Sequence, residues 1–196
     1  MSDDVDFGKK YLFQSDESVS KEFLNSLIES IPDPFYFKSI DGRYVKVNKA
    51  KAETVCSKPE DMVGKTDYDF LPEKYAKKSC EEDKKIIETG EPIINKVEKF
   101  QDSQNNIFYI SISKKPYYDK NGNLKGIIGI EKDITDIKKD EERYELFFKS
   151  SPDYIIETSE DGEILSLNPA MAERFKADPK DLIGKKINDF LPEKIL

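Results

Sequence analysis

The stretch PDPFYFKSIDGRYVKVN, residues 32–48, decides the fold of this chain. Aromatic and β-branched runs flank Asp41-Gly42 in its middle, and an Asp-Gly pair between two such runs is a strong signal for a β-hairpin. The sequence therefore predicts two antiparallel strands here. Residues 152–168 read PDYIIETSEDGEILSLN and carry the same Pro-Asp, Asp-Gly and Asn landmarks. We therefore expect a second hairpin of the same kind.

The repeat extends well beyond the hairpin. Residues 30–76 align without a gap with residues 150–196, and about 20 of the 47 positions are identical. A repeat of this length indicates a duplicated globular domain, because solenoid units recur every roughly 20–50 residues. The second copy reaches only the equivalent of Ala76. The pattern predicts one intact copy and the first part of another, in a longer array, and we expect residues 150–196 to be poorly ordered or to lean on a neighbour.

The composition argues against several classes of function. Net charge is −8, and acidic and basic residues are interspersed, whereas nucleic-acid binders gather lysine and arginine on one face. The chain has no histidine, which removes an imidazole base, a Ser-His-Asp triad, histidine-ligated metals and a phosphoacceptor histidine from this stretch. We expect no nucleic-acid partner and no enzyme activity on this chain.

The two cysteines and the N-terminus bear on the cellular compartment of the protein. Cys56 and Cys80 are too far apart in sequence for a zinc pair and too few for a disulfide framework, which favours spectator thiols. The N-terminus has no basic region followed by an apolar one, and no segment approaches the ~18 apolar residues of a membrane span. The sequence predicts a cytoplasmic protein without a membrane span.

Hydrophobic periodicity and turn residues divide the chain into five parts. They are a flexible tail at 1–16, an amphipathic helix at 17–31, a complete domain at 32–135, a helical connector at 136–149, and an incomplete second copy at 150–196. Within the complete domain, short helices follow the hairpin, a helix covers Glu73–Glu88, and strands are expected at 93–100, 107–116 and 124–134. This order predicts an α+β fold, in which five antiparallel strands form a sheet with helices on one face.

These motifs, in this order and spacing, resemble those of the PAS domain, particularly the tandem PAS modules that precede histidine kinase cores. The resemblance covers residues 30–137 almost continuously, and the second copy carries the same marks as far as Lys194. The matching residues are Pro32-Asp33-Pro34-Phe35-Tyr36-Phe37-Lys38, Asp41-Gly42-Arg43-Tyr44, Asn48-Lys49-Ala50, Val63 to Pro72, Glu88-Thr89-Gly90-Glu91-Pro92, Asn121-Gly122, Gly126 to Ile130 and Asp133-Ile134-Thr135.

The resemblance implies a sensory role in signal transduction, as part of a multi-PAS sensor histidine kinase in a two-component system. Two interpretations remain open: a module that senses a small molecule and relays it through the connector helix, or a ligand-free module for dimerisation and relay. The cofactor is unknown. The Asn-Cys-Arg motif of flavin photoadduct members is absent around Cys56, and histidine-ligated haem is excluded, although a thiolate ligand from Cys56 or Cys80 stays open.

Strand alternation predicts which side chains face a ligand pocket between the sheet and the helices. The apolar candidates are Phe37, Val47, Ile110, Ile112 and Ile128. Three polar side chains, Tyr68, Asp83 and Lys114, are candidates to orient a ligand. The alternative is that the apolar set simply packs the core and that the polar set is solvated or paired.

Two further roles follow from position in the chain. Asp133 and Thr135 lie where the last strand meets the connector, so they can cap that helix, and the resemblance makes this the point of signal relay. Tyr36, Tyr109 and Ile127 are predicted to point away from the helices. An apolar patch there needs cover, and we expect a homodimer through this face.

Overall fold

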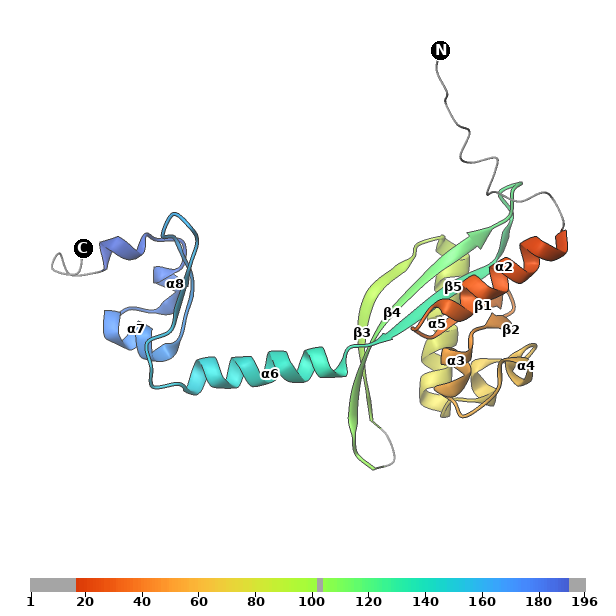
Figure 1. Cartoon of the computed structure of the whole chain (residues 1–196), viewed down its shortest axis with the longest axis horizontal. Coiled ribbons are helices and arrows are strands. Elements are labelled where there is room, and N and C mark those ends of the chain that lie inside the picture. Colours follow the sequence, from red (N-terminus) through yellow and green to blue (C-terminus); the bar gives the residue numbers. More distant parts are fainter. Residues whose placement is uncertain (1–16, 102–103, 191–196) are drawn as a thin grey trace, which may run out of the picture. The chain divides into compact units, whose positions relative to one another are not determined.

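The computed structural model describes residues 17–101 and 104–190, which form two compact units that meet between Ile134 and Thr135 (Figure 1). The tail at 1–16 lies outside the described residues. Each unit is considered by itself below.

The first unit is built on a five-stranded antiparallel sheet, which confirms the predicted fold class. Its strand order is β2-β1-β5-β4-β3, so the last strand in the chain lies at the centre of the sheet. The strands are β1 (Phe35–Ser39), β2 (Tyr44–Val47), β3 (Ile93–Gln101), β4 (Ile107–Tyr118) and β5 (Leu124–Asp133).

Helices between β2 and β3 cover one face of this sheet, the inner face (Figure 1). They are α3 (Lys49–Glu53), α4 (Pro59–Met62), η1 (Asp67–Asp69) and α5 (Glu73–Thr89). The longest, α5, contacts β4 and β5 and ends at Gly90, whose φ of +73° places it in the left-handed region that favours glycine. An earlier helix, α2 (Glu17–Ser30), precedes the sheet.

Asn48 ties the hairpin to the helices through its side-chain hydrogen bonds. Its Oδ1 accepts hydrogen bonds from the N–H groups of Phe35 and Lys51, both at 2.9 Å. Its Nδ2 donates to the carbonyl oxygens of Ile31 and Asp33. Asn168 repeats the whole pattern in the second copy. This residue is therefore a structural landmark of the repeat.

The prediction for the faces of β1 and β5 is wrong. Tyr36 and Ile127, expected on the outer face, are 1% and 0% exposed on the inner face. Phe37 and Ile128, expected in the pocket, pair with each other on the outer face. Apolar residues occupy both odd and even positions of β1, so the alternation of the sequence does not decide which face is buried. A shift of the strand by one residue exchanges the two faces.

A glycine opposite Tyr36 accounts for the observed register. Gly129 is the partner of Tyr36 across the β1–β5 ladder, and a Cβ atom there would lie 2.1 Å from the Tyr36 ring. The missing side chain makes room for the ring over the inner face.

The second unit begins with α6 (Thr135–Ser150), where the sequence predicts the connector. A hairpin and short helices follow: β6 (Ile156–Thr158), β7 (Ile164–Leu167), α7 (Pro169–Phe175), α8 (Pro179–Leu182) and η2 (Ile187–Asp189). They enclose an apolar core of their own, which contains Ile164, Leu167 and Leu182. Residues 156–189 thus form regular elements around a core, and the expectation that this copy is poorly ordered or leans on a neighbour stays a prediction.

Helix length and hydropathy also bear on membrane insertion. Among the residues that the structure describes, no helix is both long enough and apolar enough to cross a bilayer.

Candidate functional site

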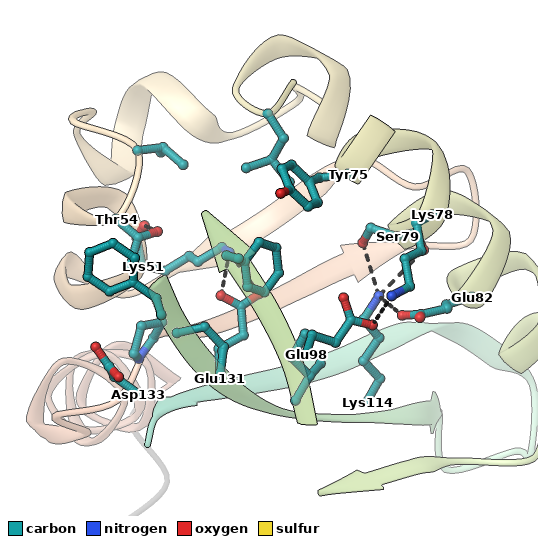
Figure 2. Close-up of a pocket in the computed structure, with 17 residues that line it drawn as sticks. Lys51, Thr54, Tyr75, Lys78, Ser79, Glu82, Glu98, Lys114, Glu131 and Asp133 are labelled. Atoms are coloured by element: carbon teal, nitrogen blue, oxygen red, sulfur yellow. Dashed lines mark hydrogen bonds and ion pairs between the residues drawn. The ribbon is translucent and has the colours of Figure 1, made fainter. Parts of the chain in front are cut away.

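A cavity of about 310 Å³ lies between the inner face of the sheet and the helices of the first unit (Figure 2). This volume lies at the lower end of the range for small-molecule sites. Its lining residues are Pro34, Lys51, Thr54, Val55, Leu71, Tyr75, Lys78, Ser79, Glu82, Glu98, Phe100, Phe108, Ile110, Ile112, Lys114, Glu131 and Asp133.

The middle of the cavity is apolar. Ile110 and Ile112 of β4 form part of its floor, and the ring of Tyr75 from α5 packs against Phe100 with 4.9 Å between centroids. Among the described residues, the Tyr75 hydroxyl has no hydrogen-bond partner. This hydroxyl is therefore free to donate to, and accept from, a bound molecule.

One end of the cavity is formed by an ion pair between α3 and β5. Lys51 Nζ lies 2.8 Å from both carboxylate oxygens of Glu131. The Lys51 side chain is 5% exposed, and its ammonium also lies 5.2 Å from the centroid of the Tyr36 ring. Thr54 and Asp133 lie at this same end (Figure 2).

The other end is formed by Lys114 of β4 and polar groups of α5. Lys114 Nζ lies 2.8 Å from Asp83 Oδ1, 3.0 Å from Ser79 Oγ and 3.2 Å from Glu82 Oε2, and its side chain is 2% exposed. Beside it, Lys78 Nζ lies 2.9 Å from Glu98 Oε1 (Figure 2). Lys96, outside the lining, pairs with both Glu82 and Glu98.

Behind this end, the charges continue into the core as an alternating chain. Asp83 bridges Lys114 and Lys38, and Lys38 Nζ lies 2.9 Å from Asp83 Oδ2 and 2.5 Å from Asp67 Oδ2. The Tyr44 hydroxyl donates to Asp67 Oδ1 at 2.5 Å. We call Lys38, Tyr44, Asp67, Asp83 and Lys114 the buried ion network.

The network holds Lys38 and Asp67 in their charged forms. Burial disfavours the Lys38 ammonium, but the carboxylates of Asp83 and Asp67 outweigh burial and raise the pKa of Lys38. Burial likewise opposes the Asp67 carboxylate, but the charge of Lys38 and the hydrogen bonds from Lys38 and Tyr44 lower the pKa of Asp67. Burial, followed by the charge of Asp67, raises the pKa of Tyr44, which therefore stays a neutral donor.

The second copy forms the same hairpin without these charges. Lys38, Tyr44, Lys51 and Asp67 correspond to Thr158, Ile164, Met171 and Ile187. Ile164 and Met171 are buried in the core of that copy, and Ile187 packs against it. The hairpin and its short helices therefore fold around an apolar core, and the charged side chains of the first copy belong to its cavity and to the wall behind it.

The structure brings together only part of the predicted site. Ile110, Ile112 and Lys114 line the cavity, and Asp83 stands directly behind Lys114. Val47 is buried but packs into the core cluster around Tyr36. The remaining apolar candidates, Phe37 and Ile128, lie on the outer face as described above.

The prediction that Tyr68 lines the pocket is also wrong. It is 54% exposed on η1 and does not line the cavity, because its neighbour Asp67 takes the inward position beside Lys38. Sequence reasoning found Lys114 and Asp83 at one end of the cavity but missed Lys51 and Glu131 at the other. The one available signal was the contrast between copies, since Lys51 stands where the second copy has Met171.

The predicted relay residues lie at the end of β5. Asp133 lines the cavity and is the last residue of that strand. Thr135 is buried and is the first residue of α6. The cavity wall and the start of α6 are thus two residues apart in the chain.

On the outer face, aromatic and aliphatic side chains remain partly exposed. Phe37 packs edge-on against Tyr117 of β4, with ring centroids 5.3 Å apart, and Tyr109, predicted to face outward, lies on this face beside Lys99. We call the following residues the outer apolar face: Phe35, Phe37, Tyr117, Ile128 and Ile130.

The cysteines and acidic residues give no sign of a metal site. Cys56 is exposed, Cys80 is half-buried, and neither lines the cavity. Within residues 17–101 and 104–190, no group of three or more cysteine, aspartate or glutamate side chains is arranged to hold a metal ion.

Comparison with protein families gives two adjacent matches. A family model described as PAS fold matches residues 28–139, and a second PAS fold model matches residues 142–195. The methanogenesis regulatory histidine kinase FilI of Methanothrix harundinacea is 27% identical over 122 residues. That alignment covers 62% of this chain but 14% of the kinase, so the chain spans a small part of this relative.

Solved structures agree on the fold. The VqmA dimer of Vibrio cholerae has a TM-score of 0.53 at 24% identity, covering 59% of this chain and 52% of that one. A phage VqmA–DPO complex has a TM-score of 0.53 at 19% identity, over 85% and 77% of the two chains. An RNA-binding light-oxygen-voltage receptor reaches 0.52 at 12% identity, over 69% and 39%.

Proposed function

This chain belongs to the PAS family, and on that premise we propose that its first copy binds a small molecule in the cavity and relays the binding to α6. The observation that carries the proposal is the position of two cavity residues on β5. Glu131 and Asp133 line the cavity, and α6 begins at Thr135. A ligand that moves either carboxylate therefore acts on the backbone that leads directly into the helix.

The wider setting proposed for this module is a multi-PAS sensor histidine kinase in a two-component system. The similarity to a histidine kinase and the two adjacent PAS matches support this assignment. The chain has no histidine, so the phosphoacceptor would lie outside these residues. The role proposed for this stretch is thus sensory rather than catalytic, and its location cytoplasmic.

Solved relatives give independent support for ligand binding by this fold. One VqmA structure is described as bound to DPO, and it has a TM-score of 0.51 with 19% identity to this chain. The cavity described here is an apolar space with polar groups at both ends, which is the usual design of a small-molecule site.

The test is native mass spectrometry of the purified protein. We expect a co-purified small molecule in the wild type and its loss in Ile110→Trp, because an indole at this lining position fills the cavity. Val97→Trp is the matched control, since Val97 is 48% exposed on β3 and does not line the cavity. Protein that is empty in every preparation would favour relay without a ligand.

A homodimer is the second candidate function, in which the module relays motion through contact between two copies. The outer apolar face supports it, as do apolar residues of α2 that remain half-exposed within the unit: Phe23, Leu24 and Leu27. Burying these side chains against a second copy would remove apolar surface from water. The residues that we propose for this interface are Phe37 and Ile128, not Tyr36 and Ile127 as the sequence predicted.

A further inference from the structure

The charges around the cavity are already paired. Three lysines line it, and each has a carboxylate partner: Lys51 has Glu131, Lys78 has Glu98, and Lys114 has Asp83 and Glu82. The lining also holds four carboxylates, those of Glu82, Glu98, Glu131 and Asp133. Every lysine of the lining is thus neutralised by at least one carboxylate.

This arrangement opposes the entry of an anion. A carboxylate or phosphate at Lys51 would have to compete with Glu131, which takes two of the three N–H donors of the ammonium. At Lys114 it would have to displace Ser79, Asp83 or Glu82. The displaced carboxylate would remain in a poorly solvated site without its partner, which is costly.

The unused hydrogen-bonding capacity suits an uncharged molecule. Each oxygen of Glu131 accepts one bond from Lys51 and has a further lone pair to offer to an N–H or O–H group. The Tyr75 hydroxyl can donate to a carbonyl or hydroxyl oxygen. Between these groups lie Phe100, Phe108 and Ile110, which favour an apolar body.

We propose that the cavity selects a small uncharged molecule with an apolar body and an N–H or O–H edge, and that it excludes anions. This inference rests on the proposed sensory function and narrows its ligand class. Lys51 and Glu131 are the residues that determine this specificity, because together they present acceptors while cancelling the lysine charge.

The experiment compares two probes of nearly equal shape, benzamide and benzoate, by calorimetry and ligand-observed NMR with the full chain. Benzamide is uncharged and carries N–H donors, whereas benzoate is an anion with no donor. We expect the wild type to bind benzamide at least about tenfold more tightly than benzoate. Equal or tighter binding of benzoate would overturn the inference.

A single substitution should reverse this preference. Glu131→Gln leaves Lys51 without its carboxylate, so benzoate should gain affinity and benzamide should not. Glu53→Gln is the control, because Glu53 is an exposed carboxylate that pairs with Lys49 on the same helix, outside the cavity. If Glu131→Gln fails to fold, Glu98→Gln frees Lys78 at the other end and predicts the same shift.

The remaining outcomes separate this inference from the proposed function. An unchanged ratio of the two affinities in a folded Glu131→Gln variant, or no binding of either probe at millimolar concentration, would overturn the ligand class. A co-purified ligand that is an anion would also overturn it, while leaving the sensory function standing. If the protein prefers benzamide but always purifies without a bound molecule, the proposed class of uncharged ligands would be supported and the proposed sensory function weakened.

Discussion

Lys38 shows what a single buried side chain contributes to this molecule. Its side chain is 1% exposed on β1. The equivalent residue of the second copy, Thr158, carries no charge. A buried ion pair is weak evidence for stability, because desolvation of the charges offsets much of their attraction. The pairing of Lys38 with Asp67 and Asp83 does, however, fix the position of the Asp83 side chain. Asp83 in turn holds Lys114 at the cavity.

Removal of one partner should be costly. We expect Asp67→Asn to destabilise the first unit by about 3 kcal/mol, because Lys38 loses half of its compensation in a buried site. The measurement is hydrogen exchange of β1 and β5 amides under native conditions. A loss in protection below about 0.5 kcal/mol, the range of ordinary surface changes, would contradict this expectation.

Two comparisons sharpen that experiment. The triple change Lys38→Thr, Tyr44→Ile and Asp67→Ile, which copies the second repeat, should cost less than Asp67→Asn alone, because Lys38 and Asp67 are removed as a pair and Asp83 keeps Lys114 as its partner. The pKa of Asp67 is lower in the folded than in the unfolded state, so its contribution is complete above about pH 4 and is lost as the pH falls. Asp67→Asn should lack this acid-sensitive part.

Strand β5 connects the three functions proposed for the first unit. Its inner side presents Glu131 and Asp133 to the cavity, its outer side presents Ile128 and Ile130, and its end leads into α6. The Ile134 N–H donates to the Tyr109 carbonyl at 2.9 Å, which ties the exit of the strand to β4. A shift of β5 would therefore affect cavity, outer face and helix together.

Asp133→Ala tests the link between β5 and the helix. We expect the first unit to stay folded and hydrogen exchange across residues 136–148 to rise, because the side chain at the end of β5 no longer fixes the start of α6. Asp140→Ala is the control, since Asp140 is an exposed carboxylate within α6 that pairs with Arg143. Unchanged exchange in Asp133→Ala would count against the relay.

The two repeats distribute charge differently. The first unit combines a charged cavity wall with an outer apolar face, whereas the described part of the second copy has an apolar core in its hairpin and short helices. This contrast is consistent with the proposal that the first copy binds the ligand. Association of two chains would leave the cavity accessible, because the outer face lies on the opposite side of the sheet.

Dimerisation through the outer face can be tested with one charge. Light scattering should give a dimer for the wild type and a monomer for Ile128→Lys, because Ile128 is 37% exposed at the centre of that face. Ile183→Lys, at a 51% exposed position in the second copy, is the control and should stay dimeric. A wild type that remains monomeric at high concentration would exclude this interface.

The sequence by itself determined the duplication, the hairpins, and the antiparallel sheet with its helices. These features depend on turn residues and periodicity, which act over a few neighbouring positions. Only the tertiary structure decided which face of β1 is buried, because Phe35, Tyr36 and Phe37 suit either side and the choice depends on Gly129, some ninety residues later. The same holds for one end of the cavity, since Lys51 and Glu131 are 80 residues apart and only the fold makes them a pair.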